Sequence, residues 1–158
     1  MADVAGIIER LGLTHHPEGG YYREIYRHPL HLNAAKGNRN LATSIYYLLH
    51  DSQISKFHRL TSDEIWYHHA GNSAIIHCFF QESGYAKIKL GSLEKKGLYQ
   101  VVLPAGTIFG AEVENKHGYF LAGCMVSPGF DFNDFEFVPR DELLTNYPDY
   151  KNIIYKFT

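Results

Sequence analysis

The chain has 158 residues, with 15 Lys and Arg against 17 Asp and Glu, and a formal net charge of −2 at pH 7. This length suits one compact domain over residues 1–158. Because the basic residues are scattered and form no cluster, we expect neither nucleic acid nor an anionic membrane as a partner. No apolar stretch approaches the roughly twenty residues of a membrane span, and the N-terminus lacks a signal-peptide pattern. We therefore expect a soluble, cytoplasmic protein.

The two cysteines, Cys78 and Cys124, both lie within apolar runs. Free cysteine is often buried as a small apolar side chain, so we expect two unpaired thiols in a reducing compartment. One disulfide would form only in an oxidising compartment.

A short helix is predicted near the N-terminus, within residues 3–13. Asp3 can cap its first turn, its apolar residues share one face, and Gly12 can adopt the left-handed conformation that ends a helix.

About ten short strand-like runs follow, separated by Gly, Asn, Asp, Ser or Pro. Their spacing of roughly eight to twelve residues is typical of a β-sandwich or barrel, and the 12 Tyr and 10 Phe favour strands. The runs cover residues 21–27, 43–49, 56–60, 63–69, 73–80, 85–90, 99–103, 107–113, 118–126 and 131–138.

The last of these runs is irregular, because its alternation of Phe and polar residues shifts phase at Asp134. A turn or bulge is expected there, and the phenylalanines should close the core or the seam of a dimer. After it, Pro139 can begin a helical piece that Pro148 would close. The apolar tail over residues 153–157 should dock on the body.

Residues 58–71, HRLTSDEIWYHHAG, carry the strongest indication of chemistry. They place two acid-base or metal-binding side chains, His58 and Glu64, on adjacent short strands. On strand parity His58 and Leu60 share one face, and Glu64 and Trp66 share one face. Parity does not decide whether these faces point into the barrel.

This stretch resembles the first cupin motif, with His58, Glu64 and Gly71 at motif positions and Leu60 where a second His is expected. The stretch LPAGTIFGAEV is similar to the second cupin motif, with Phe109 in place of its His. Two of the four motif ligands are therefore replaced by side chains without a lone pair.

Several segments occur in the order found in one small cupin family of largely unassigned function: HPEGGYYRE, TSIYYLL, FHRLTSDEIW, LPAG and SPGFDFNDFE. That family is grouped with the RmlC-like cupins, relatives of the dTDP-sugar 3,5-epimerases. The resemblance implies an all-β antiparallel jelly-roll barrel, here with a short helix at each end. It also implies a homodimer and a small polar ligand, with a sugar nucleotide as the candidate.

The first functional hypothesis is a metal-independent enzyme resembling an epimerase or isomerase. His58 would move a proton beside a carbonyl group, Glu64 would assist, and Tyr46 or Tyr67 would serve as the opposing acid. An apolar pocket raises the pKa of a carboxyl group and lowers that of an imidazole, which favours this chemistry. Whether the chain is an enzyme at all stays open.

A divalent transition metal is the alternative, with His58 and Glu64 as its ligands. A catalytic metal generally takes three protein ligands, so a metal-dependent oxygenase would have to borrow His68 or His77. We therefore expect no cofactor.

A noncatalytic binding module is the third hypothesis. Its candidate ligand-binding residues are Arg23, Trp66, His68 and Phe109. Arg23 would hold an anionic group bidentately or form a surface ion pair, and the aromatic residues, Tyr46 included, would stack on a ligand or pack in the core.

In the simplest structural interpretation, His58 and Glu64 form a buried pair that joins two strands. The other histidines are expected to be solvated: His15, His16, His28, His31, His50 and His117.

Overall fold

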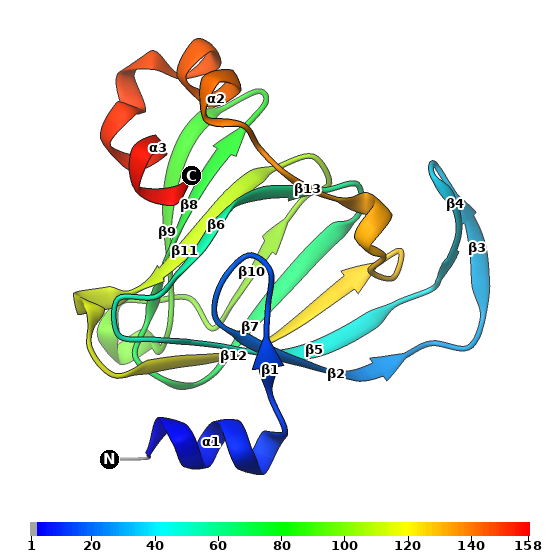
Figure 1. The fold of residues 1–158 in the computed structure, drawn as a ribbon, viewed down its shortest axis with the longest axis horizontal. Helices are drawn as coiled ribbons and strands as arrows, with labels where there is room; N and C mark the ends of the chain where they lie inside the picture. Colours follow the sequence, from blue (N-terminus) through cyan, green and yellow to red (C-terminus); the bar gives the residue numbers. More distant parts are fainter. Residues whose placement is uncertain (1–2) are drawn as a thin grey trace.

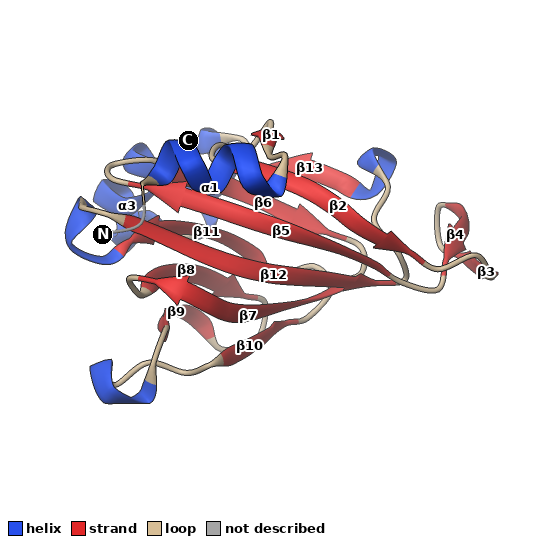
Figure 2. Cartoon of the chain, turned by 90° about the horizontal axis from the view of Figure 1, so that it is seen from below, coloured by secondary structure: helices blue, strands red, loops and turns tan. Residues whose placement is uncertain are grey.

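The N-terminal helix α1 is set at both ends by the residues that flank it. The computed structural model describes residues 3–158, in which α1 spans Val4–Leu11. The Asp3 side chain accepts a 3.2 Å hydrogen bond from the backbone N–H of Ala5, and Gly12 ends the helix with a left-handed φ of 62°. The prediction of this helix is confirmed. It lies outside the larger of two sheets (Figures 1 and 2).

The body of the molecule consists of two antiparallel sheets, which confirms the predicted all-β jelly roll. The larger sheet has the order β1-β2-β5-β12-β7-β10 and the smaller one β13-β6-β11-β8-β9. The strands of the larger sheet are β1 (Thr14–His15), β2 (Tyr21–Arg27), β5 (Thr43–His50), β12 (Tyr119–Ser127), β7 (Asp63–Gly71) and β10 (Gln100–Leu103). Those of the smaller sheet are β13 (Phe135–Phe137), β6 (Ile54–Leu60), β11 (Ile108–Val113), β8 (Ala74–Phe80) and β9 (Gly84–Leu90).

The core lies between the two sheets, where alternate side chains of each strand point inward. Tyr47, Trp66 and Phe120 of the larger sheet pack there with Ile76 and Phe109 of the smaller sheet. All five side chains are buried. They fill part of the space between the sheets, and the remainder is the cavity described below.

Two helices cover the outer face of the smaller sheet near the C-terminus (Figure 1). The predicted helix begins after Pro139, as α2 (Arg140–Asn146). Pro148, however, starts a 3₁₀ turn, η4 (Pro148–Tyr150), that leads into α3 (Lys151–Phe157). Proline suits the first turn of a helix because its missing N–H would have no intrahelical partner there. The apolar tail docks, with Ile154 and Phe157 fully buried.

A two-stranded hairpin of β3 (His31–Ala34) and β4 (Gly37–Asn40) projects from the body (Figure 1). Sequence analysis did not predict it, because its residues HLNA and GNRN include no β-branched or aromatic side chain. The contacts that join this hairpin to the body are described with the site.

The expected irregularity in residues 131–138 is a 3₁₀ turn, η3 (Phe132–Asp134), which precedes the short strand β13. The remaining 3₁₀ turns are η1 (Leu93–Lys95) and η2 (Glu114–Lys116). Both cysteines are buried and unpaired, as expected. None of the helices within residues 3–158 has the length and apolar character that crossing a membrane requires.

Candidate functional site

A cavity of about 360 Å³ opens between the two sheets. It lies near the first residues of β5 and β7 and the last residues of β6 and β12. Its ionisable lining residues are His16, Glu18, Glu24, Arg27, His58, Glu64, Cys124 and Asp131. Its aromatic walls are Tyr22, Tyr47, Trp66, Phe130, Phe132 and Phe135. The exposed side chains of Glu24, Arg27 and Phe132 mark its mouth. Cavities of this size, largely apolar with a few polar groups, commonly bind small molecules.

The central feature of the cavity is the pair formed by Glu18 and His58. Nε2 of His58 lies 3.2 Å from Oε2 of Glu18, and the two side chains are 2% and 7% exposed. The other carboxylate oxygen, Oε1, accepts a 2.8 Å hydrogen bond from the hydroxyl of Ser55. Each oxygen of the carboxylate thus faces either a hydrogen-bond donor or an imidazole, and these partners reduce the free-energy cost of burying the charge.

The loop that presents Glu18 depends on two glycines. Gly19 has a φ of 116° and Gly20 a φ of 74°, a region that only glycine enters readily. A Cβ on Gly19 would stand 2.0 Å from the carbonyl oxygen of Ile54. The backbone of the loop therefore comes close against β6, where the carbonyl of Glu18 accepts a 2.9 Å hydrogen bond from the N–H of Lys56.

The orientation of the His58 ring is fixed by its second nitrogen. Nδ1 lies 2.7 Å from the carbonyl oxygen of Lys56, and since a carbonyl only accepts, Nδ1 carries the hydrogen. Nε2 is then the nitrogen that faces the carboxylate of Glu18. The Phe135 ring stacks on the His58 ring, with 5.1 Å between the ring centroids, and the Phe109 ring meets it edge-on, with 4.3 Å between the ring centroids.

Glu64 occupies the same cavity in a different environment. One of its carboxyl oxygens accepts a 2.7 Å hydrogen bond from the indole N–H of Trp66. Burial raises the pKa of Glu64 to about 8, and the negative charge of Glu18 adds to this rise. Glu64 therefore carries a proton at neutral pH, in contrast to an ordinary glutamate.

Tyr47 lies between these groups and the core. Its hydroxyl donates a 2.7 Å hydrogen bond to the carbonyl oxygen of Gly19, which holds the loop from inside the barrel. Burial raises the pKa of the Tyr47 phenol well above its ordinary value, and the charge of Glu18 raises it further. Tyr47 is therefore a neutral donor and part of the cavity wall.

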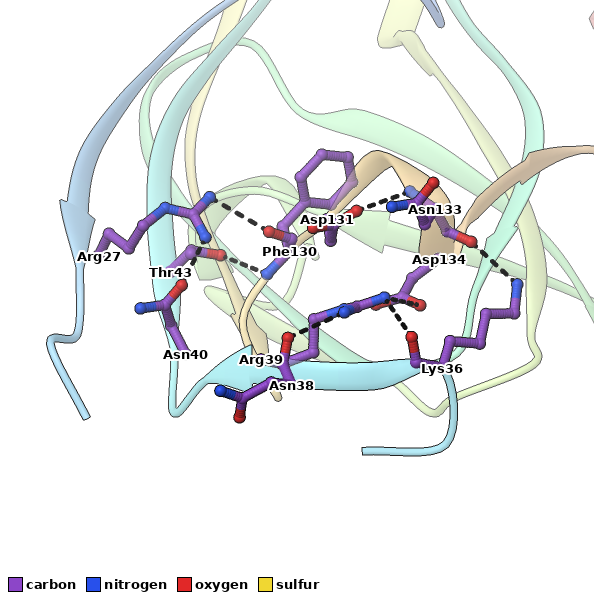
Figure 3. Close-up of polar contacts among 10 residues, drawn as sticks. All are labelled: Arg27, Lys36, Asn38, Arg39, Asn40, Thr43, Phe130, Asp131, Asn133 and Asp134. Atoms are coloured by element: carbon purple, nitrogen blue, oxygen red, sulfur yellow. Dashed lines mark hydrogen bonds and ion pairs between the residues drawn. The ribbon is translucent and has the colours of Figure 1, made fainter. Parts of the chain in front are cut away.

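Residues 130–135 form one side of the mouth and are tied to three other elements (Figure 3). The guanidinium of Arg27 donates to the carbonyl oxygen of Phe130 at 3.1 Å, and the Thr43 hydroxyl accepts from the Phe130 N–H at 2.9 Å. Lys36, from the projecting hairpin, donates to the carbonyl oxygen of Asn133 at 3.0 Å.

The strongest tie to this segment is a buried ion pair between Arg39 of the hairpin and Asp134 (Figure 3). Nε and Nη2 of Arg39 donate to the two carboxylate oxygens at 2.6 and 3.0 Å. Such a bidentate geometry is the most directional that a carboxylate can accept. The guanidinium beside Asp134 holds the pKa of that carboxyl below its usual value.

Among the predicted catalytic residues, His58 and Glu64 line the cavity, and Tyr46 and Tyr67 do not. Tyr46 is the neighbour of the wall residue Tyr47 in β5, and Tyr67 is the neighbour of the wall residue Trp66 in β7. Because neighbouring side chains of a strand point to opposite faces, both tyrosines point to the outer face of the larger sheet. There Tyr46 contacts the exposed ring of His69. The predicted buried contact between His58 and Glu64 is also replaced, because Nε2 of His58 faces Glu18.

Of the predicted ligand-binding residues, only Trp66 lines the cavity. Arg23 points outward and donates a 3.0 Å hydrogen bond to the last carbonyl of α1, that of Leu11, so it is not available in the mouth. Phe109 is buried in the core behind His58. The His68 ring packs against the Phe120 ring, with 5.9 Å between the ring centroids, and does not line the cavity.

Sequence analysis missed Glu18 and misjudged His16. The expectation that His16 is solvated is wrong, since its side chain is only 6% exposed, 3.6 Å from Glu18. Burial lowers the pKa of His16, an effect that the charge of Glu18 opposes. His15, His31 and His117 are exposed as expected. The signal that could have located Glu18 was the pair of glycines after it, which permits a close backbone approach.

The donor set does not fit a catalytic metal. Leu60, which stands in place of the second His of the first motif, lines the cavity, and Phe109, which stands in place of the His of the second motif, packs against His58. His77, considered as a substitute ligand, lies under the C-terminal helices, where its ring faces Tyr85 and Glu112. Within residues 3–158 no three His, Cys, Asp or Glu side chains gather as metal ligands would.

Comparison with known proteins agrees with this architecture. Residues 5–138 match the family described as Cupin superfamily (DUF985). The chain belongs to this cupin family. It is 34% identical over 149 residues to the uncharacterized protein YML079W of Saccharomyces cerevisiae, an alignment covering 84% of this cupin and 73% of the yeast protein.

Two solved structures of similar length resemble this cupin over its whole length. A hypothetical protein from Leishmania major has a TM-score of 0.92 and 34% identity, covering 99% of each chain. Protein SO0799 from Shewanella oneidensis has a TM-score of 0.90 and 41% identity, covering 100% of this chain and 98% of that one.

Proposed function

We propose that this cupin is an isomerase or epimerase that moves a proton at a carbon atom next to a carbonyl group of a small polar molecule. The pair formed by His58 and Glu18 accepts the proton, and Glu64 donates one. The observation that carries this proposal is the presence, in one cavity, of two carboxyl groups with opposite environments.

The two carboxyl groups suit opposite roles. Glu18 accepts a hydrogen bond from the Ser55 hydroxyl on one oxygen and faces Nε2 of His58 with the other, which places it beside the base of the proposed reaction. Glu64 is buried against Trp66 and the charge of Glu18, so it keeps its proton at neutral pH. A protonated carboxyl group and a pair of carboxylate and imidazole in one cavity supply the acid and the base that proton transfer requires.

The proposed reaction balances within this cavity. The C–H bond breaks and its proton goes to the pair of His58 and Glu18. The electron pair left behind forms the C=C bond of an enol, and the carbonyl oxygen takes the proton of Glu64. To form an isomer, the protonated pair gives its proton to the former carbonyl carbon, while the Glu64 carboxylate takes the hydroxyl proton of the neighbouring carbon, where the new C=O bond forms. To form an epimer, the enol returns its O–H proton to Glu64 as the C=O bond re-forms, and the pair gives its proton to the opposite face of the same carbon after the enol has turned over in the cavity.

Deuterium wash-in tests this proposal directly. The protein is incubated in D₂O with a panel of small aldoses, ketoses and their phosphate esters, and exchange at the carbon next to the carbonyl is followed by proton NMR. We expect wash-in with the wild type, and its loss in both Glu64→Gln and His58→Asn. Wash-in that persists in both variants, or its absence for a compound that occupies the cavity, would contradict catalysis.

A noncatalytic binding module is the second candidate, because six aromatic residues wall the cavity. For the same experiment it predicts that a compound binds in the cavity without deuterium exchange at its carbon atoms. A metal-dependent oxygenase is the weaker candidate, since Leu60 and Phe109 occupy two motif positions and neither can ligate a metal.

A further inference from the structure

Among the described residues that line the cavity, one is a permanent cation, Arg27, and that cation is already engaged. Arg27 donates from Nε and Nη2 to the two carboxylate oxygens of Glu24, at 2.8 and 2.7 Å. Nη1 donates to the side chain of Asn40 at 2.8 Å, and Nη2 also reaches the carbonyl oxygen of Phe130. Every nitrogen of the guanidinium therefore has a partner within the protein.

Acidic groups outnumber this cation around the cavity. Glu24 neutralises Arg27, while Asp131 at the mouth and Glu18 inside add negative charge. One oxygen of Asp131 accepts a 2.9 Å hydrogen bond from the N–H of Asn133, and the negative charge of Asp131 also acts on the engaged Arg27. A phosphate group entering this site would meet like charges, and within residues 3–158 the lining offers it no free arginine or lysine, the residues that normally bind phosphate.

The walls favour a different kind of ligand. Carboxylate oxygens of Glu18 and Asp131 are acceptors for hydroxyl groups, and the protonated carboxyl group of Glu64 is a donor to a carbonyl or hydroxyl oxygen. Tyr22, Trp66 and Phe130 offer apolar ring surface beside these acceptors. The volume of about 360 Å³ lies near the lower end of the range for small-molecule sites.

We propose that the ligand is an uncharged, polyhydroxylated carbonyl compound of the size of a free monosaccharide, and not a phosphate ester or a sugar nucleotide. The carbonyl group in this statement rests on the proposed function. The lack of a phosphate rests separately on the engagement of Arg27 and on the surplus of acidic side chains.

Binding can be measured without turnover, because Trp66 is the single tryptophan of the chain and lines the cavity. Its fluorescence is titrated with matched probes: glucose and glucose 6-phosphate, fructose and fructose 6-phosphate, and galactose and UDP-galactose. We expect at least one free sugar to bind, and its phosphorylated or nucleotide-linked form to bind about tenfold more weakly or worse, a loss of about 1.4 kcal/mol. Equal or tighter binding of the phosphorylated form, or the failure of every free sugar to bind, would overturn the inference.

A variant tests the physical reason. Glu24→Gln removes one negative charge and frees part of the Arg27 guanidinium, so the affinity for the phosphate ester relative to the free sugar should rise about tenfold, the size of one charge-assisted hydrogen bond. Glu136→Gln is the matched control, because Glu136 pairs with Arg59 away from the cavity and should leave the ratio unchanged. An unchanged ratio in Glu24→Gln would contradict the role given to Arg27.

The two proposals fail separately. Binding of a free sugar without deuterium wash-in would sink the proposed catalysis and leave the ligand class standing. Wash-in that occurs only with phosphate esters would support catalysis and overturn the ligand class.

Discussion

Nε2 of His58 lies 3.2 Å from Oε2 of Glu18, so the histidine of the first cupin motif is paired with a carboxylate from outside that motif. Glu18 also acts on Glu64, because its negative charge contributes to the raised pKa of that residue. Three titratable groups of the cavity are thus electrostatically linked through one side chain.

This link predicts the effect of Glu18→Gln on Glu64. The variant keeps a polar side chain near Ser55 and His58 but removes the charge. The pKa of Glu64 should fall below about 8 and remain above 4.5, because burial, the larger cause of the rise, is unchanged. Carbon-13 NMR titration of the glutamate carboxyl groups measures it, and a Glu64 pKa that does not move would refute the coupling.

Glu64 also predicts how stability depends on pH. Its pKa is about 8 in the folded protein and near 4.5 when unfolded, so between these values the folded state holds the extra proton. The free energy of unfolding should therefore decrease as pH rises from about 4.5 to 8, by up to about 1.4 kcal/mol per unit from this group.

Urea denaturation at pH 5, 6.5 and 8 checks this slope in the wild type and in Glu64→Gln. His16 acts in the opposite direction, since its lowered pKa makes stability rise with pH below 6.5. The difference between the two proteins isolates Glu64, and the exposed Glu82→Gln serves as control. Parallel pH profiles for wild type and Glu64→Gln would show that the group is not buried as described.

The loop that carries Glu18 should not tolerate a side chain at Gly19. A Cβ there would stand 2.0 Å from the carbonyl oxygen of Ile54, so Gly19→Ala must displace the loop. Gly84→Ala is the matched control, with a φ of 74° but nothing within 4 Å, and should cost about 1–2 kcal/mol from backbone strain alone. Thermal denaturation should show a clearly larger loss for Gly19→Ala, and equal losses would contradict the close approach.

The ion pair between Arg39 and Asp134 should keep residues 130–135 ordered at the mouth. Asp134→Asn leaves Arg39 without its bidentate partner, so backbone amides in this segment should exchange hydrogen several-fold faster. Glu136→Gln, which breaks a more exposed pair with Arg59, should change exchange there little. Hydrogen exchange with mass spectrometry compares the two, and unchanged protection in Asp134→Asn would mean that the other ties suffice.

The donor set predicts that this cupin binds no stoichiometric first-row metal at His58 and Glu64. Elemental analysis by mass spectrometry, on protein purified without a His tag or chelator, should find well under one metal per chain. The double variant Leu60→His with Phe109→His supplies the two missing motif ligands and should raise the metal content. A stoichiometric metal in the wild type that His58→Ala removes would contradict the acid-base proposal.

The fold followed from the sequence because its signals are local. Short strand-like runs at regular spacing, the Asp3 and Gly12 caps of α1 and the cupin-like motif residues each act within a few positions of the chain. The helix α3 and the projecting hairpin escaped prediction. Phe157 of α3 is buried in a cluster of distant residues, and Arg39 of the hairpin pairs with Asp134, contacts that local sequence signals do not reveal.

By itself, the sequence predicted a sandwich or barrel of short strands, the helix α1, the start of α2 and the presence of His58, Glu64 and Trp66 in one region, and its resemblance to a cupin family implied the jelly roll. Tertiary structure decided which faces of the strands point inward, and so selected Tyr47 over Tyr46 and turned Tyr67 and Arg23 to the outside. It also brought Glu18 against His58. Strand parity gives relative orientation only, and a contact between distant segments depends on how the whole chain packs.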